Sequence, residues 1–383
     1  MILHIVSDNI FVDMAYRVFE TVYPGKNEFI LAERNNKLKY IKNTPVDYVH
    51  RLNIIKKSFS DNLKNYEMVI LHGMDDFKMQ CVLKADSSIK FVWIGFGGDY
   101  YKHSILSDEL LLPKTLKLKE ELENFYKLNQ MANKFLFKLK KLIKKILFEE
   151  NNELETINKI KFFSPVLKEE FNLVKEKVPN FKPKYLSWNY GSLEDLIKGF
   201  EGFGVTEQNI LLGNSASFSN NHLDAIEFLS KIDLEGKKVI CPLSYGDLNY
   251  GKSILVAGNE TWGKNFIPLI DFMPIDKYIE LISSCSIVIM NHLRQQALGN
   301  IITMMYLGAK VFLDERNILY HFFKNEGAHV FSTQQLIDDH SLINSFLSQS
   351  EIETNKLILR RHWSREAIIQ KTNRLVNIVK NHN

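Results

Sequence analysis

The stretch Ile210-Leu211-Leu212-Gly213-Asn214-Ser215-Ala216-Ser217-Phe218-Ser219-Asn220-Asn221-His222 carries the clearest sign of the fold. An apolar run ends at Gly213, and small, hydroxylated residues then lead into the helical pattern of His222–Lys231. A buried strand followed by a loop and a helix is the repeating unit of a parallel α/β sheet. The loop is not a GxGxxG fingerprint, so a dinucleotide cofactor is not expected.

The same alternation of apolar runs and helical patterns fills both halves of the chain, which predicts two Rossmann-like units with parallel sheets. The expected strands are Ile2–Val6, Phe29–Leu31, Val46–His50, Met68–Leu71 and Phe91–Ile94, then Ile210–Leu212, Lys238–Cys241, Phe266–Leu269, Ser286–Met290 and Lys310–Leu313. The expected helices are Phe11–Val22, Ile54–Leu63 and Phe77–Leu83, then His222–Lys231, Tyr250–Asn259, Ile275–Ser283 and Asn300–Leu307.

The length of 383 residues predicts two domains. We expect residues 1–190 and 209–352 to form them, with a glycine-containing linker at 191–208 and one or two helices at 353–383. Ligands bind beyond the carboxyl ends of parallel strands. Two such sheets facing across a cleft can therefore hold a donor and an acceptor, as in GT-B glycosyltransferases, although some nucleotide-sugar epimerases share this architecture.

Composition excludes several classes of protein. The net charge of +4 is too small for a dedicated nucleic-acid binder. The three cysteines, Cys81, Cys241 and Cys285, are far apart and lie among apolar residues, which favours buried, reduced thiols in the cytoplasm. The start of the chain reads as a strand rather than a signal peptide, and no apolar run is long enough to cross a membrane. Without HExxH, CxxC or DxD patterns, no metal or other cofactor is expected.

The glycine-rich stretch Gly95–Tyr101 (GFGGDYY) follows the expected strand Phe91–Ile94. Glycines at the end of a strand let the backbone approach a ligand. Asp99 would then lie at the ligand-binding edge of the first sheet, where a carboxylate can act as a general base. The alternative is a turn stabilised by an Asx-type hydrogen bond.

Three stretches of the second half follow expected strands: 213–222, 242–246 and 291–300. Small and hydroxylated residues in the first can present N–H groups to a diphosphate. Tyr245 in the second can stack on a base or sugar ring, and Arg294 in the third can neutralise phosphate charge. The alternatives are a plain loop with Asn220 or Asn221 as helix N-cap, a structural turn and a surface arginine.

The segment 133–148 predicts an amphipathic helix with an apolar stripe and a lysine-rich face. The lysines suit the surface of an anionic membrane, and the membrane-facing residues would be Lys134, Lys138, Lys141 and Lys145. The alternative is an ordinary surface helix with solvated lysines.

These motifs together resemble one family. Over most of the chain, and in the same order, the sequence resembles the TDP-N-acetylfucosamine:lipid II N-acetylfucosaminyltransferases. The resemblance rests on Trp93–Tyr100 (WIGFGGDY), Gly213-Asn214-Ser215, Asn221-His222, Pro242, Tyr245-Gly246, Arg294-Gln295-Gln296 and Gly299, with Ser7-Asp8 after the first strand.

The resemblance implies a metal-independent GT-B enzyme that moves a 4-acetamido-4,6-dideoxyhexose from a TDP-sugar to an undecaprenyl-diphosphate-linked oligosaccharide. Such an enzyme works peripherally at the cytoplasmic face of the bacterial inner membrane, in enterobacterial common antigen or O-antigen synthesis. The N-terminal domain would then be the acceptor side, with Asp99 as catalytic residue. The donor-binding residues would be Gly213, Asn214, Ser215, Tyr245, Gly246, Arg294, Gln295, Gln296, Gly299 and Asn300.

Three other readings stay open at this point. A fucosyltransferase would use a GDP-sugar, which competition between TDP and GDP would reveal. A nucleotide-sugar epimerase would turn over its substrate without an acceptor. A non-catalytic membrane scaffold would tolerate the loss of Asp99 and Arg294.

Overall fold

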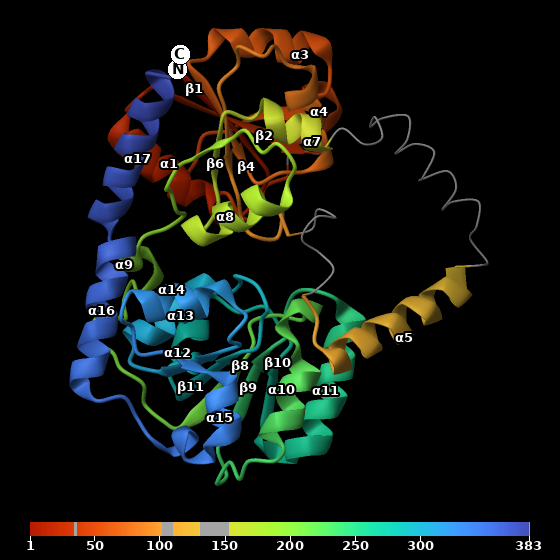
Figure 1. Ribbon diagram of the computed structural model, residues 1–383, viewed down its shortest axis with the longest axis vertical. Coiled ribbons are helices and arrows are strands. Elements are labelled where there is room, and N and C mark those ends of the chain that lie inside the picture. Colours follow the sequence, from red (N-terminus) through yellow and green to blue (C-terminus); the bar gives the residue numbers. More distant parts are fainter. Residues whose placement is uncertain (34–36, 102–109, 131–152, 383) are drawn as a thin grey trace. The chain divides into compact units, whose positions relative to one another are not determined.

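The structure, a computed structural model, describes residues 1–33, 37–101, 110–130 and 153–382 (Figure 1). The chain divides into two compact units. The lysine-rich segment 133–148, with Lys134, Lys138, Lys141 and Lys145, lies entirely outside the described residues, so its helix and its contact with a membrane stay predictions. Unit 1 comprises Met1–Ser107, Lys134–Ser192 and Trp363–Asn383, and unit 2 comprises Asp108–Asn133 and Leu193–His362.

Unit 1 is built on a seven-stranded parallel sheet with the strand order β3-β2-β1-β4-β5-β6-β7. Strands β1, β4, β5 and β6 are buried along their whole length, as expected for strands covered on both faces. The strands are β1 (Ile2–Val6), β2 (Asn27–Glu33), β3 (Asp47–His50), β4 (Met68–His72), β5 (Phe91–Ile94), β6 (Phe162–Ser164) and β7 (Lys184–Tyr185).

The last helix of the chain packs against the first helix of unit 1 (Figure 1). Phe19 of α1 and Leu375 of α17 share one buried cluster with Ile2 of the central strand. The helices are α1 (Val12–Val22), α2 (Arg51–Ile54), α3 (Lys57–Asn62), η1 (Leu63–Asn65), α4 (Asp76–Lys84), α7 (Glu153–Lys159), α8 (Lys168–Lys177) and α17 (Arg365–Lys380).

The single helix expected over Ile54–Leu63 is wrong. The backbone is extended at Lys56, and two short helices, α2 and α3, take its place. A continuous helix would place Ile54 and Leu63 on opposite faces, because nine residues make two and a half turns. The break lets both side chains reach the core, where they are almost fully buried.

Unit 2 is built on a six-stranded parallel sheet with the order β10-β9-β8-β11-β12-β13. The strands are β8 (Asn209–Leu212), β9 (Val239–Pro242), β10 (Phe266–Leu269), β11 (Cys285–Met290), β12 (Lys310–Leu313) and β13 (Phe331–Ser332). The helices are α5 (Pro113–Gln130), α9 (Leu193–Leu196), α10 (His222–Leu229), α11 (Leu248–Trp262), α12 (Ile275–Ile282), α13 (Leu298–Tyr306), α14 (Ile318–Asn325), α15 (Thr333–Asp338) and α16 (Gln349–Trp363), with short turns η3 (Phe218–Asn220), η4 (Gly263–Asn265) and η5 (His340–Asn344).

The two all-parallel sheets confirm the predicted α/β fold with two Rossmann-like units. In each sheet the strand order reverses once, between β1 and β4 in unit 1 and between β8 and β11 in unit 2. Open α/β sheets bind their ligands where the strand order reverses in this way.

The first unit does not comprise the continuous residues 1–190 that the sequence predicted. Helix α5 follows β5 of unit 1 in sequence, and yet it packs on α10 and belongs to unit 2.

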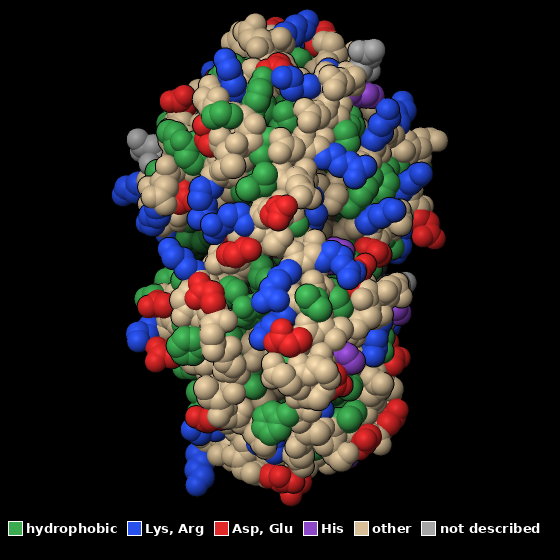
Figure 2. Space-filling view, turned by 90° about the vertical axis from the view of Figure 1, so that its left-hand side faces the viewer, with side chains coloured by type: hydrophobic (Ala, Val, Ile, Leu, Met, Phe, Trp, Pro, Cys, Tyr) green, Lys and Arg blue, Asp and Glu red, His purple; other side chains and the backbone are tan. Residues whose placement is uncertain are grey.

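The surface carries mixed charge. Lys and Arg side chains are interspersed with Asp and Glu side chains on the face shown in Figure 2. The three cysteines are buried and free, as expected, and burial raises the pKa of the Cys81 thiol to about 12. Within the described ranges, no helix is long and apolar enough to span a bilayer, and no three His, Cys, Asp or Glu side chains gather as a set of metal ligands.

Candidate functional site

Three loops of unit 2 meet at the carboxyl ends of β8, β9 and β11, where the strand order reverses. They are loop A (213–221), loop B (243–247) and loop C (291–297). Loops A and C flank the reversal between β8 and β11, which is the preferred ligand position of this sheet topology. All three were singled out by sequence for donor binding.

Loop A turns sharply at Gly213, whose φ is +67°. A Cβ atom there would lie 2.4 Å from His222 Nε2 and 2.7 Å from Asn220 Oδ1, so only glycine fits. The Asn220 side chain then braces the loop from inside. Its Oδ1 accepts a hydrogen bond from the Asn214 backbone N–H (2.9 Å), and its Nδ2 donates to the Ser215 and Ser217 carbonyls (3.0 and 3.1 Å).

Backbone hydrogen bonds join loop B to loop A. The Ala216 N–H donates to the Tyr245 carbonyl (2.8 Å), and the Asp247 N–H donates to the Ala216 carbonyl (2.7 Å). Gly246 lies between these two bonds with a φ of +121°, and a Cβ on it would meet the Ala216 carbonyl oxygen at 2.3 Å. Gly246 is therefore required by the close approach of the two loops.

Side chains of the three loops form one hydrogen-bonded chain. Asn214 Nδ2 donates to the Tyr245 hydroxyl (2.9 Å), and Gln296 Nε2 donates to Asn214 Oδ1 (3.0 Å). The Ser219 hydroxyl in turn donates to Gln296 Oε1 (2.6 Å). The structure thus brings together Asn214, Tyr245 and Gln296, three of the residues predicted from sequence, in one connected surface.

Of the remaining predicted residues, Ser215 lies on loop A and the others lie on loop C and the start of α13. Ser215 and Gln295 are buried, and Arg294 is half-buried with its Nη1 donating to the Gln295 carbonyl (2.8 Å). Gly299 and Asn300 occupy the first turn of α13, where Asn300 Nδ2 donates to the Tyr278 hydroxyl (2.9 Å). A cation beside a helix N-terminus favours a phosphate ligand.

Two buried histidines adjoin loop A, His222 as the first residue of α10 and His292 as a residue of loop C. His292 Nε2 must donate to Asn220 Oδ1 (2.9 Å), because that oxygen also accepts the Asn214 N–H. Burial lowers the pKa of His222 to about 3 and that of His292 well below its usual value. Both imidazoles are therefore neutral at pH 7, and they support the loops without adding charge to them.

Three exposed apolar side chains, called the apolar rim, follow strands at the same edge of the sheet as Tyr245. Leu248, Ile270 and Phe272 lie on the segments that follow β9 and β10, and their side chains are 78%, 59% and 79% exposed. These two strands are neighbours in the sheet. The rim and Tyr245 offer an apolar and aromatic surface next to the polar chain of loops A to C.

Asp99 of unit 1 ends the turn Gly95–Asp99 after β5. Its carboxylate accepts hydrogen bonds from Met74 N (2.9 Å), Trp93 Nε1 (2.8 Å) and Phe96 N (2.8 Å). Burial raises the pKa of Asp99, although these three donors oppose the shift. Asp99 therefore stabilises its own turn by accepting the Phe96 N–H, three residues before it, which differs from the Asx turn considered from sequence, where the oxygen accepts the N–H two residues further on. A raised pKa also suits a base.

A buried hydrogen-bonded string in unit 1 escaped sequence reasoning. His4 Nδ1 pairs with His72 Nε2 (2.9 Å), and His72 Nδ1 pairs with the Tyr190 hydroxyl (2.7 Å). Burial lowers the pKa of His4 to about 3, so the string is neutral. The Tyr190 ring stacks on Phe96 of the Asp99 turn, which ties the turn to the core.

Asp8 has a structural role here. Its carboxylate accepts the backbone N–H groups of Lys39, Tyr40 and Ile41 (2.5, 3.0 and 2.9 Å). The resemblance that included Ser7-Asp8 gave no role for this pair. The aspartate holds the loop after β2 against the end of β1.

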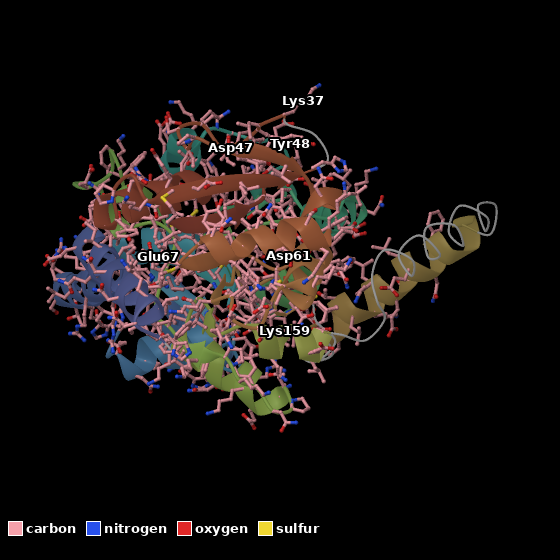
Figure 3. The ribbon with its side chains drawn as sticks, turned by 90° about the horizontal axis from the view of Figure 1, so that it is seen from above. Lys37, Asp47, Tyr48, Asp61, Glu67 and Lys159 are labelled. Atoms are coloured by element: carbon pink, nitrogen blue, oxygen red, sulfur yellow. The ribbon has the colours of Figure 1, made fainter. Side chains whose placement is uncertain are left out.

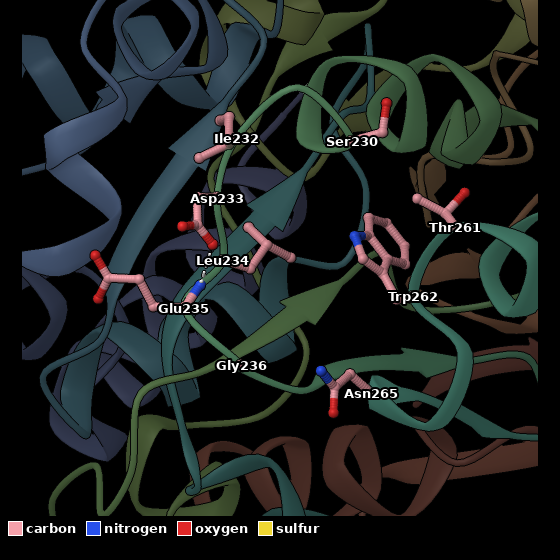
Figure 4. Close-up of a pocket in the computed structure, with 9 residues that line it drawn as sticks. All are labelled: Ser230, Ile232, Asp233, Leu234, Glu235, Gly236, Thr261, Trp262 and Asn265. Atoms are coloured by element: carbon pink, nitrogen blue, oxygen red, sulfur yellow. Dashed lines mark hydrogen bonds between the residues drawn. The ribbon is translucent and has the colours of Figure 1, made fainter.

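A pocket of about 280 Å³ lies elsewhere in unit 2, lined by residues that precede β9 and β10 (Figure 4). Trp262 and Leu234 contribute to its wall, and the Glu235 N–H donates to Asp233 Oδ1 (2.9 Å). Because these residues precede the strands, the pocket lies at the opposite edge of the sheet from loops A to C. It is not part of the candidate site.

The sequence indicated no supporting role at the site for Ser219, Asn220, Asn221 or His292, and Asn220 and Asn221 were considered only as N-cap candidates. Asn221 does occupy the N-cap position of α10, but its side chain makes no cap hydrogen bond there. Each of these side chains contacts a segment distant in sequence. The only local sign of these residues in the sequence is that their loops are rich in small, polar and amide side chains.

Residues 203–359 match the family described as 4-alpha-L-fucosyltransferase, glycosyl transferase group 56. Solved structures with similar folds include a glycosyltransferase from Rickettsia africae (13% identity, TM-score 0.60, 100% of this chain and 99% of that one). Others are the lipopolysaccharide outer core galactosyltransferase WaaB (10%, 0.61, 99% and 99%) and Anabaena HepE in complex with UDP and glucose (12%, 0.62, 100% and 99%).

The matched region 203–359 contains loops A, B and C and the start of α13, so the family match and the candidate site coincide. The structural neighbours establish the GT-B fold. Together, the fold and the family match identify the chain as a GT-B glycosyltransferase in which residues 203–359 of unit 2 are similar to fucosyltransferases.

Proposed function

We propose that the chain transfers a 4-acetamido-4,6-dideoxyhexose, Fuc4NAc, from a TDP-sugar to an undecaprenyl-diphosphate-linked oligosaccharide in bacterial surface polysaccharide synthesis. The observation that carries the proposal is the series of side-chain hydrogen bonds Tyr245–Asn214–Gln296–Ser219, which connects all three loops at the strand-order reversal. The match of residues 203–359 to a fucosyltransferase family supports a 6-deoxy sugar donor.

In this proposal unit 2 binds the donor. Backbone N–H groups of the first turn of α13 and the Arg294 guanidinium offset the charge of the diphosphate, which stabilises the departing nucleoside diphosphate. The Tyr245 ring and the apolar rim of Leu248, Ile270 and Phe272 suit a base that carries a methyl group and a sugar that lacks a hydroxyl. The protein itself offsets the charge, so no metal is required.

Unit 1 binds the acceptor, and Asp99 takes the proton from the acceptor hydroxyl as that oxygen attacks the anomeric carbon. Its raised pKa brings the carboxylate closer to the working pH of a base. The lysine-rich segment 133–148 holds the enzyme at the cytoplasmic face of the inner membrane, where a lipid-linked acceptor resides.

The test is a donor screen. Purified full-length protein is incubated with TDP-Fuc4NAc, UDP-sugars or GDP-fucose and a short polyprenyl-diphosphate acceptor, in EDTA, and products are identified by mass spectrometry. Transfer from the TDP-sugar alone is expected. Transfer only from GDP-fucose would replace the proposed donor, and turnover of nucleotide sugar without acceptor would indicate an epimerase.

A GDP-fucose donor is the second candidate, since the matching family is described as a fucosyltransferase. Competition binding separates the two donors directly. Under the main proposal TDP displaces a labelled donor at lower concentration than GDP does.

A further inference from the structure

The start of helix α5 is held on unit 2 by two side chains, one at the end of loop A and one in the first turn of α10. Asn221 Oδ1 accepts a hydrogen bond from the Leu112 N–H (2.8 Å). The Asp224 carboxylate accepts the Lys114 and Thr115 N–H groups (2.9 and 3.0 Å) and the Thr115 hydroxyl (2.7 Å). Asp224 of α10 therefore caps the first turn of α5, where free N–H groups favour a negative charge.

Apolar packing extends this contact. Thr115 is fully buried, and Leu118, one turn further along α5, packs against the hydrophobic core of unit 2. Lys114 Nζ also pairs with Glu227 Oε1 (3.0 Å) on the exposed side. Helix α5 is thus docked by a buried cap and a core contact, and the surface ion pair adds little.

Asn221 connects the docked segment to loop C. Its Nδ2 donates to the Asn291 carbonyl (3.0 Å), and Asn291 Nδ2 donates back to the Asn221 carbonyl (3.3 Å). Asn221 is fully buried and adopts the left-handed conformation (φ 50°, ψ 43°), which is unfavourable for a non-glycine residue unless other contacts stabilise it. The bonds to Leu112 and Asn291 supply that stabilisation.

Asn221 directly follows Asn220, whose amide fixes the backbone of loop A through Asn214, Ser215 and Ser217. The conformation of residue 221 therefore sets where the Asn220 side chain lies. A path of adjacent contacts runs from α5 through Asn221 to loops A and C.

We propose that Asn221 is a positioning residue: it couples the docking of α5 to the conformation of loops A and C, and so sets the affinity of unit 2 for a nucleoside diphosphate. The ligand in this statement rests on the proposed function, whereas the coupling rests on the contacts alone. The docked start of α5 thereby controls the donor loops of unit 2.

The test measures TDP binding to the full-length chain by calorimetry at 15 °C, beside the Tm of each variant. Asn221→Gly keeps the left-handed conformation and removes only the bridging side chain. Asp224→Asn and Thr115→Val weaken α5 docking without touching Asn221. We expect the Kd for TDP to rise about tenfold in Asn221→Gly and severalfold in the other two, as loss of one or two buried hydrogen bonds implies.

Ser332→Ala is the matched control. Ser332 is equally buried and caps α15 in the same unit, so this variant lowers the Tm while the Kd for TDP stays unchanged. If Asp224→Asn and Thr115→Val also lowered the Tm and left the Kd within twofold of wild type, α5 would be a purely structural element and the proposal would be wrong.

Hydrogen exchange separates this proposal from the proposed function. Should wild-type protein bind none of TDP, UDP or GDP, the donor proposal fails, yet the coupling is still measurable without ligand. Faster exchange of the Asn214 and Ala216 amides in Asp224→Asn is expected, because both residues lie in loop A, where the Asn220 side chain accepts the Asn214 N–H and the Tyr245 carbonyl of loop B accepts the Ala216 N–H. Unchanged exchange at these two amides would overturn the coupling.

Discussion

At the scale of single residues, Gly213 shows how a backbone turn depends on its buried surroundings. His222, which faces the missing Cβ, is fully buried and cannot move aside. Gly213→Ala is therefore expected to lose at least about 2 kcal/mol of unfolding free energy, from the left-handed φ and the clash together. Urea denaturation measures this loss, and TDP binding should weaken with it.

Gly236→Ala is the matched control for that prediction. Gly236 has a similar φ of +78° in the same unit, but no atom lies within 4 Å of its Cβ position. Gly236→Ala is expected to lose only the part of the unfolding free energy that comes from the left-handed φ, about 1 kcal/mol. Equal losses in the two variants would show that packing beneath loop A contributes nothing.

Asp99 lends itself to a test that separates a base from a turn residue. Asp99→Asn is expected to lower both the Tm and kcat, because an amide NH2 would face an N–H donor. Trp93→Phe removes one donor that favours the carboxylate, so the pKa of Asp99 rises further. If Asp99 is the base, activity falls on acidification at a higher pH in Trp93→Phe than in wild type. An unshifted pH profile would mean that Asp99 stabilises the turn and is not the base.

At the scale of elements, the loop after β2 is held by two carboxylates at the start of α1. Asp13 accepts the N–H groups of Lys42 (2.9 Å) and Thr44 (3.0 Å) and the Thr44 hydroxyl (2.6 Å), next to the bonds of Asp8. Burial alone would raise the pKa of Asp13, but the Thr44 hydroxyl and the backbone donors lower it. The loop thus depends on ionised aspartates.

We expect Asp13→Asn to lose about 1–2 kcal/mol of unfolding free energy at pH 7. A lowered folded pKa stabilises the fold above the unfolded pKa of about 4, and this gain disappears as the pH falls through the folded value. The difference between wild type and variant should therefore shrink below pH 4. Asp61→Asn, at an exposed ion pair with Lys57, is the control and should change stability by less than about 0.5 kcal/mol (Figure 3).

The sequence predicted the strongly apolar elements and missed the shortest strands and several helices, among them α5, α8 and α14. Strands such as Ile2–Val6 and Phe91–Ile94 were expected with the bounds found, because runs of buried residues are a local signal. Strands β7 and β13 have two residues each and form only because a neighbouring strand offers an edge. Pairing of that kind cannot be read from a local pattern.

The candidate site divides in the same way. Asn214, Tyr245 and Gln296 follow strand ends, so sheet topology predicts that they meet. The hydrogen bond from the Leu112 N–H to Asn221 Oδ1 joins residues 109 positions apart. Leu112 directly precedes α5, a helix that lies in the first half of the sequence but packs on unit 2. No spacing rule places α5 on unit 2, so this support was invisible in the sequence.

At the scale of the whole molecule, Glu67, labelled in Figure 3, joins the two ends of the chain in unit 1, which are marked N and C in Figure 1. Its carboxylate binds the N-terminal amine (2.6 Å), the Tyr23 hydroxyl (2.9 Å) and Lys380 Nζ (3.1 Å) at the end of α17. The hydrogen bond from the N-terminus is the main cause that lowers the pKa of Glu67 to about 2.

Glu67→Gln is expected to cost about 1 kcal/mol or less at pH 7, because the partly exposed group is screened by solvent. Since the folded pKa is lowered, this stabilisation is full above the unfolded value of about 4.3 and is lost as the pH falls towards 2. Urea denaturation at pH 7 and pH 3 measures it. A difference that grew on acidification would contradict the assignment.

The net charge of +4 makes the location of the lysines decisive for membrane binding. Each lysine near an anionic surface contributes about 1 kcal/mol, so changing Lys134, Lys138, Lys141 and Lys145 to Gln should weaken binding to phosphatidylglycerol vesicles by at least about a hundredfold. Changing Lys168, Lys175, Lys177 and Lys182, which are exposed elsewhere in unit 1, removes the same charge. If binding depends on the segment, sedimentation with vesicles falls only in the first variant. An equal fall in both would mean that overall charge, and not this segment, attracts the protein to the membrane.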